Sequence, residues 1–207
     1  MSGNLFVVAA ASGTGKTSLV AALLQLDSQI KLSVSYTTRK PRPGEVDGVH
    51  YHFIAEAEFL RMMGDGDFLE AAEVHGARYG TSQRLVEAML KAGNDLILEI
   101  DWQGAQQVRN QLPETIGIFI LPPSIDTLAH RLTHRGQDSA EVIARRLAAA
   151  REEISHVVEF DYVIINDNFQ IALDDLRTII HAQRLRCEKQ LQKHKGLLNS
   201  INNSINK

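Results

Sequence analysis

The chain has 207 residues, 44% of them hydrophobic, which is enough to bury the core of one domain with small insertions. Its net charge of −3 gives no reason to expect nucleic-acid or membrane binding, and no apolar run approaches the roughly 20 residues that span a bilayer. The lone cysteine, Cys187, excludes an intramolecular disulfide and fits a reducing compartment. Because no basic segment precedes the first apolar run, we expect no signal peptide and a soluble, cytoplasmic protein.

Apolar runs alternate with helical patterns along most of the chain, which predicts an α/β fold. Strands are expected at residues 5–9, 95–100, 116–121 and 162–165, and helices at residues 16–26, 82–92, 125–135, 139–158 and 170–192. The strand runs are continuously apolar, as in parallel strands that are covered on both faces. We therefore predict a parallel-sheet core flanked by helices, formed by residues 1–32 and 82–192. Residues 193–207 form a polar tail that is expected to fray.

The first expected strand leads into a glycine-rich turn and then a helix. The turn reads Ala10-Ala11-Ser12-Gly13-Thr14-Gly15-Lys16-Thr17. A turn of this kind ending in Gly-Lys-Thr is the pattern of a phosphate loop, although Ala10 stands where Gly is usual. Glycines let backbone N–H groups surround phosphate oxygens, Lys16 can reach the β- and γ-phosphates, and Thr17 can bind Mg²⁺. We therefore predict a P-loop NTPase-like core that binds ATP through Ser12, Gly13, Thr14, Gly15, Lys16, Thr17 and Ser18.

Residues 33–81 are more polar and richer in turns than the rest, and we predict a small mixed or antiparallel insert there. Arg39 and Arg42 lie three residues apart among the hydroxyl groups of Ser35, Thr37, Thr38 and Tyr51. Guanidinium groups and hydroxyls together suit a phosphate monoester. These residues alone leave a solvated basic loop open as the alternative.

The segment 37–53 resembles the signature of guanylate kinases. The eight fixed positions of that signature are filled by Thr37, Thr38, Arg39, Arg42, Glu45, Gly48, Tyr51 and Phe53. A chance match at eight positions is rarer than about one in a million. The resemblance extends over residues 5–186 and is greatest to bacterial members, notably at 98–104 and 135–139.

This resemblance implies an enzyme that transfers a phosphoryl group from ATP to GMP, with Mg²⁺ as cofactor and dGMP as a second acceptor. It implies that the insert binds the GMP phosphate through Arg39, Arg42, Tyr51 and Tyr79, and the guanine through Ser35, Glu70, Thr81 and Asp101. Carboxylates suit guanine, because its N1 and its exocyclic amine are donors, a pair that adenine lacks. By the same resemblance, Asn166 would lie near the donor base.

Two acids end the apolar run 95–101, and an acid after such a strand resembles the second motif of nucleotide-binding proteins. We expect Thr17 to bind Mg²⁺ directly, and Glu99 and Asp101 to act through water. Alternation puts both acids on one face of the strand. Their spacing is too generic to decide which serves the metal and which the guanine.

Arg131 and Arg135 lie four residues apart on one expected helix, and Arg146 follows on the next. The resemblance implies that this helical hairpin, at about residues 126–158, is a lid over the triphosphate. Its arginines, with Lys16 and Arg39, would then be catalytic, because positioned cations stabilise the charge of a transferring phosphoryl group. A phosphate acceptor needs no general base, so no histidine is assigned a role.

Two other functions stay open. One is a related P-loop kinase with another phosphate-bearing acceptor, against which Glu70, Thr81 and Asp101 count. The other is an interaction module without catalysis, against which Lys16 and the lid arginines count. Small nucleotides are the expected partners, nucleic acids and membranes are not, and the sequence is compatible with a homo-oligomer.

Overall fold

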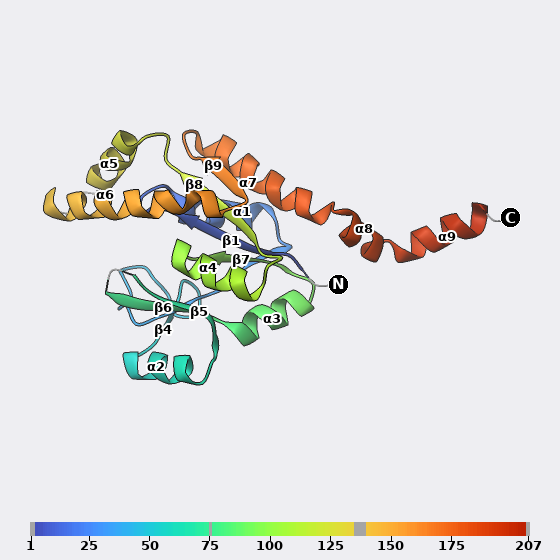
Figure 1. Cartoon of the computed structure of the whole chain (residues 1–207), viewed down its shortest axis with the longest axis horizontal. Helices are drawn as coiled ribbons and strands as arrows, with labels where there is room; N and C mark the ends of the chain where they lie inside the picture. The colour runs from blue at the N-terminus through green and yellow to red at the C-terminus, as the bar shows by residue number, and fades with distance from the viewer. Residues whose placement is uncertain (1–2, 75, 135–139, 206–207) are drawn as a thin grey trace.

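The computed structural model describes residues 3–74, 76–134 and 140–205. Its core is a parallel sheet in the order β2-β7-β1-β8-β9, which confirms the predicted α/β class (Figure 1). The strands are β2 (Ile30–Leu32), β7 (Asp95–Glu99), β1 (Leu5–Ala10), β8 (Ile116–Leu121) and β9 (Tyr162–Ile165). All but β2 follow the sequence prediction, and β2 was missed because it is short and only Ile30 is fully buried.

Helices cover both faces of this sheet, as continuously apolar parallel strands require. On one face, α1 (Lys16–Leu26) and α7 (Phe169–Arg184) pack against Phe6 and Val8 of β1. On the other, α3 (Gln83–Lys91) and α4 (Trp102–Gln111) pack against Leu5 and Val7. Successive residues of β1 therefore serve opposite halves of the core. Helix α4 was not predicted, because its polar sequence buries little beyond Gly104, Ala105 and Val108.

A second, mixed sheet lies between β2 and α3 in the sequence. Its order is β4-β3-β6-β5, with β3 and β4 parallel and the other pairs antiparallel. The strands are β3 (Tyr36–Thr37), β4 (His52–Phe53), β5 (Phe68–Val74) and β6 (Ala77–Ser82). Helix α2 (Glu56–Gly64) covers this sheet by burying Phe59 against Phe68, with ring centroids 4.6 Å apart. This insert sheet provides one wall of the site.

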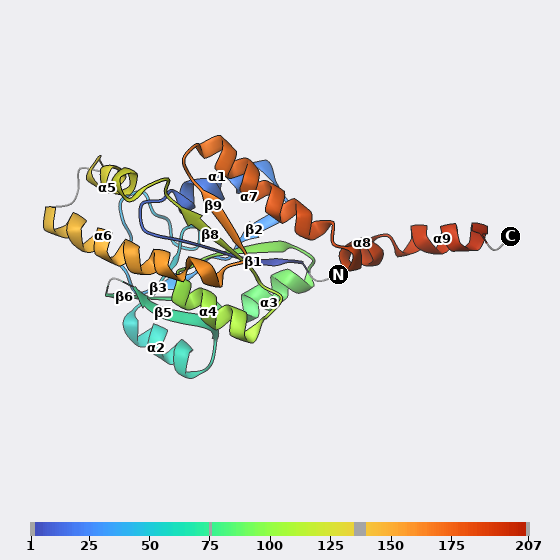
Figure 2. The same ribbon diagram turned by 45° about the horizontal axis from the view of Figure 1, so that its top comes forward.

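Two helices, α5 (Ile125–His134) and α6 (Ala140–Ser155), form a hairpin that continues into the 3₁₀ turn η1 (His156–Glu159). Figures 1 and 2 show the hairpin at one end of the core sheet, away from the C-terminal helices. Leu128, Leu132 and Ala150 bury its base against Ala11 of the phosphate loop. Arg135, which the sequence predicted to be a lid residue, lies outside the described residues.

The C-terminal region departs from the predicted single helix over residues 170–192. Helix α7 ends at Arg184, and Arg186 has an extended backbone (φ −54°, ψ 138°) before α8 (Cys187–Lys193) begins. The tail that was expected to fray contains α9 (Lys195–Ile205), which extends away from the core (Figure 2). None of the described helices is long and apolar enough to cross a membrane.

Candidate active site

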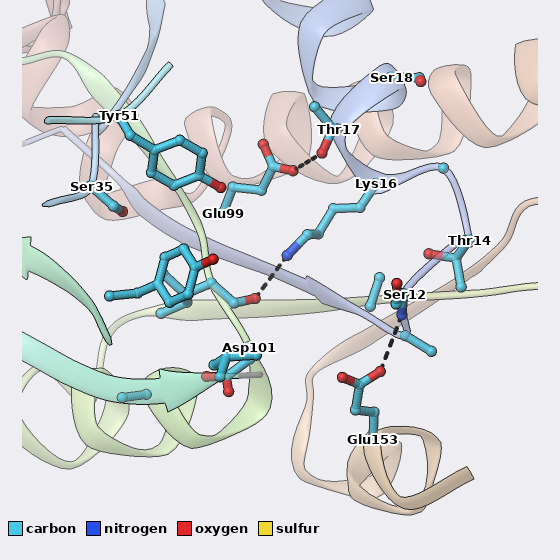
Figure 3. A pocket seen from close by; sticks show the side chains of 18 of the residues that line it. Ser12, Thr14, Lys16, Thr17, Ser18, Ser35, Tyr51, Glu99, Asp101 and Glu153 are labelled. Atoms are coloured by element: carbon cyan, nitrogen blue, oxygen red, sulfur yellow. Dashed lines mark hydrogen bonds between the residues drawn. The ribbon is translucent and has the colours of Figure 1, made fainter. Parts of the chain in front are cut away.

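A cleft lies between the C-terminal ends of β1 and β7 and the insert sheet (Figure 3). The carboxyl ends of parallel strands are where α/β proteins bind ligands, because loops and helix N-termini gather there. The cleft brings together most of the residues predicted from the sequence. These are Ser12, Gly13, Thr14, Gly15, Lys16, Thr17, Ser18, Ser35, Tyr51, Glu70, Tyr79, Glu99 and Asp101.

The phosphate loop is shaped by two glycines with positive φ, Gly13 (+94°) and Gly15 (+97°). A Cβ at Gly15 would lie 2.5 Å from Asn166 Nδ2, so the loop also needs glycine for close packing. Buried Asn166 donates from Nδ2 to the Thr14 carbonyl oxygen at 2.6 Å. Asn166 thus supports the loop from the end of β9.

The two acids that the sequence did not distinguish have different surroundings. Glu99 Oε1 accepts a hydrogen bond from the Thr17 hydroxyl. Asp101 caps α4 instead, accepting the Gly104 N–H through Oδ1 at 2.9 Å (Figure 3). Lys16 donates from Nζ to the Ile100 carbonyl oxygen at 3.0 Å, between the two acids in sequence. Glu99 therefore lies beside the phosphate loop, and Asp101 belongs to the start of α4.

Oxygen ligands suitable for Mg²⁺ meet at Thr17 and Glu99. One hydroxyl and one carboxylate leave most of the coordination shell to water and phosphate oxygens, as Mg²⁺ prefers. Within the described parts of the chain, no three His, Cys, Asp or Glu side chains group into a closed metal site. The donor set therefore fits a metal that arrives with a nucleotide.

A buried carboxylate forms the opposite side of the cleft. Glu70 is 3% exposed, and its Oε1 accepts the Thr81 hydroxyl at 2.6 Å. The Ser35 and Thr81 hydroxyl oxygens are 3.5 Å apart. Burial, together with the negative charge of Asp101, raises the pKa of Glu70 to about 7. On α4, Gly104 leaves room for this group, since a Cβ there would lie 2.7 Å from Glu70 Oε2.

The arginine pair of the insert lies in one loop, with its members in different environments. Arg39 donates from both terminal nitrogens to Glu45, at 2.7 and 2.9 Å, and its guanidinium lies 5.4 Å from the centroid of the Tyr51 ring. The Arg39 guanidinium lowers the pKa of Glu45 to about 2. The Tyr51 ring meets the Tyr79 ring edge-on, with centroids 5.9 Å apart. Arg42 is exposed, and its backbone N–H donates to Glu45 at 2.6 Å.

The lid arginines that the structure describes both contact the phosphate loop. Arg131 donates to the carbonyl oxygens of Thr14 at 3.3 Å and Asn166 at 3.0 Å. Arg146 donates to the Ser12 hydroxyl at 2.8 Å. These contacts hold guanidinium groups at the edge of the predicted triphosphate site.

Among the charged side chains that line the described part of the cleft, one was not predicted from the sequence. Glu153 of α6 lines the cleft, and its Oε2 accepts the Ser12 backbone N–H at 3.1 Å. An acid on a helix rich in charged residues is usually part of a solvated face. The only signal was the spacing of about two helical turns from Arg146, which places both side chains on one face.

Comparisons with known proteins identify the family to which the chain is similar. A family model described as guanylate kinase matches residues 2–183. The guanylate kinase of Methylobacillus flagellatus is 65% identical over 97% of this chain and 100% of that protein. That of Dechloromonas aromatica is 58% identical over 95% of this chain and 98% of that protein. A crystal structure of guanylate kinase from Anaplasma phagocytophilum has a TM-score of 0.76 and 33% identity, covering 90% of this chain and 88% of that one.

Proposed function

Given that the chain belongs to the guanylate kinase family, we propose that its cleft transfers the γ-phosphoryl group of ATP to GMP, with Mg²⁺ as cofactor. One observation carries the assignment of the two substrates. A single cleft has a phosphate loop on one wall and, on the other, a buried carboxylate beside two hydroxyls. The phosphate loop suits the triphosphate of a phosphoryl donor. The buried carboxylate suits a base that has a pair of hydrogen-bond donors.

On the donor side, the loop amides and Lys16 bind the phosphates of ATP. Lys16 Nζ exchanges the Ile100 carbonyl, its acceptor at 3.0 Å, for phosphate oxygens. Thr17 would hold Mg²⁺ directly and Glu99 would hold it through a water ligand, in keeping with the hydrogen bond between these side chains. The chemistry that Mg²⁺ would supply there is the neutralisation of charge on the phosphates of ATP.

On the acceptor side, Arg39, Arg42, Tyr51 and Tyr79 bind the GMP phosphate, and Glu70 and Asp101 accept from the guanine. The burial of Glu70 makes this recognition selective. Guanine supplies donors to the carboxylate, whereas adenine would leave it without them, and a missing partner in such a pocket can cost a factor of about 10⁴ in specificity. Ser35 and Thr81 orient the base. In this binding mode none of the proposed ligands binds the 2′-hydroxyl, so dGMP is a second acceptor.

During transfer, the insert (residues 33–81) and the lid (about 126–158) close over the core. Arg131 and Arg146 then turn from the loop residues that they contact to the transferring phosphoryl group. The same catalytic role is proposed for Arg135, which lies outside the described residues. Closure excludes water, which would otherwise accept the phosphoryl group. The GMP phosphate is largely ionised at neutral pH and attacks without a general base.

The test is ADP release from ATP with GMP, dGMP, AMP, CMP or UMP, each with Mg²⁺ and with excess EDTA. Rapid Mg²⁺-dependent release with GMP and dGMP alone is expected. Turnover with another acceptor would remove Glu70 and Asp101 as guanine ligands, and no turnover would favour an interaction module. The comparisons favour neither alternative.

We further propose that the enzyme acts in the cytoplasm, and gel filtration will establish whether it is a homo-oligomer.

A further inference from the structure

Two side chains of α6 hold the same residue of the phosphate loop. Arg146 donates to the Ser12 hydroxyl at 2.8 Å, and Glu153 accepts the Ser12 backbone N–H at 3.1 Å. The two are about two helical turns apart, and Ala150, fully buried between them, packs with Ala11 of the loop. The hydroxyl and the backbone N–H of Ser12 are therefore both held by the lid helix.

Glu153 brings a carboxylate to the wall of the cleft that binds a polyanion. The backbone N–H groups of such a loop are the donors that phosphate oxygens use. An N–H that donates to a carboxylate is not available to a phosphate, and two anions so close repel one another. Figure 3 shows the Glu153 side chain beside Ser12 and away from Ser35 and Tyr51 on the acceptor wall. The conflict therefore concerns the donor nucleotide and spares GMP.

We propose that Glu153 holds the lid helix on the phosphate loop and competes with the phosphates of ATP or ADP for the Ser12 backbone N–H. The nucleotide and the carboxylate cannot both accept the hydrogen bond of the Ser12 backbone N–H. Nucleotide binding therefore releases the lid helix from Ser12. Arg146, on the same face of α6, then turns from the Ser12 hydroxyl to the phosphates. This inference rests on the proposed binding of ATP at the loop, and it links arrival of the donor to movement of the lid.

The test is the substitution Glu153→Gln, which keeps the size of the side chain and one acceptor oxygen but removes the charge. Glu152→Gln is the matched control, because Glu152 is its neighbour on the exposed side of α6. Binding of ATP, ADP and GMP is measured by calorimetry at low and high salt. Glu153→Gln should bind ATP and ADP about three- to tenfold more tightly than wild type, and this gain should shrink as salt rises. GMP binding should be unchanged in both variants.

The proposal is overturned if Glu153→Gln and Glu152→Gln bind ATP equally, or if Glu153→Gln binds ATP more weakly than wild type. The pair Glu153→Ala and Glu152→Ala repeats the comparison without placing the side-chain amide of Gln next to Ser12. The same order of ATP affinities is expected. Failure of the proposed function has a different signature. In that case wild type itself would not bind ATP or would release no ADP with GMP. If only the proposed competition by Glu153 is wrong, wild-type turnover stays intact.

Discussion

Replacing Glu70 by Gln tests the assignment of the guanine site most directly. The change preserves volume at a position that is 3% exposed, and the amide oxygen can still accept the Thr81 hydroxyl. If it does, the amide nitrogen turns toward the base and presents N–H donors to the donors of guanine. The substitution therefore removes an attractive contact and adds a repulsive one without creating a cavity.

The magnitude follows from the burial of this carboxylate. A hydrogen bond to a charged group contributes about 1.5–3 kcal/mol, and an unsatisfied buried donor costs about 1–3 kcal/mol. We expect a combined loss of about 2–4 kcal/mol of transition-state binding for GMP, since the two contributions overlap. This corresponds to a decrease of about 30- to 1000-fold in kcat/KM. Turnover of AMP should change only a few-fold, so the preference for GMP collapses.

The assay is kcat/KM for GMP and for AMP in wild type and in Glu70→Gln. Glu73→Gln is a suitable control, because Glu73 lies on the same strand with an exposed side chain. A Glu70→Gln enzyme that kept the wild-type ratio of GMP to AMP turnover would refute the assignment. The base would then be recognised by other groups of the cleft.

The raised pKa of Glu70 also predicts a pH dependence. In the proposed binding mode guanine requires the charged carboxylate, but burial raises the pKa of this group to about 7. The KM for GMP should therefore rise as the pH falls below about 7, toward about tenfold per pH unit. The GMP phosphate titrates nearby, with a second pKa of about 6, so the difference between the wild-type and Glu70→Gln profiles isolates the contribution of Glu70.

The same shift affects folding stability in a known direction. The folded-state pKa of Glu70 lies above its ordinary value of 4.5, so the folded protein binds this proton more tightly than the unfolded chain does. The contribution of Glu70 to the free energy of unfolding is therefore present at low pH and is lost as the pH rises from about 4.5 to about 7. In chemical denaturation at several pH values, the free energy of unfolding of wild type relative to that of Glu70→Gln should therefore fall across this range.

Three further substitutions test the other parts of the cleft. Lys16→Ala should lower kcat by at least about a hundredfold through loss of charge stabilisation, while GMP affinity measured by calorimetry stays within a few-fold of wild type; equal turnover would refute the phosphate-loop assignment. Arg42→Ala should raise the KM for GMP about ten- to a hundredfold at nearly constant kcat, and a normal KM would remove Arg42 from the phosphate site. Thr17→Ala should raise the Mg²⁺ concentration required for half-maximal turnover, and an unchanged Mg²⁺ titration would place the metal elsewhere.

Some of the structure could not be predicted from local sequence patterns. Helix α4 lacks a strong apolar stripe, and Gly104 in its first turn disfavours a helix. The glycine is explained by the clearance that it gives Glu70, a residue of β5 in the insert sheet. Strand β2 exists because β7 provides an edge for it to pair with. In both cases a distant partner, rather than the local pattern, decides the conformation.

By itself, the sequence determined the features that depend on neighbouring residues. The phosphate loop, the apolar strands of the core and the arginine-bearing insert motif are contiguous, and their backbone preferences and spacing are local properties. Only the tertiary structure decided which acid faces Thr17, how deeply Glu70 is buried, and that Glu153 reaches Ser12. These properties join residues that are far apart in the chain, and they depend on how helices and sheets pack. Packing sets the distance between charges and their exposure to water, and local periodicity carries no information about either.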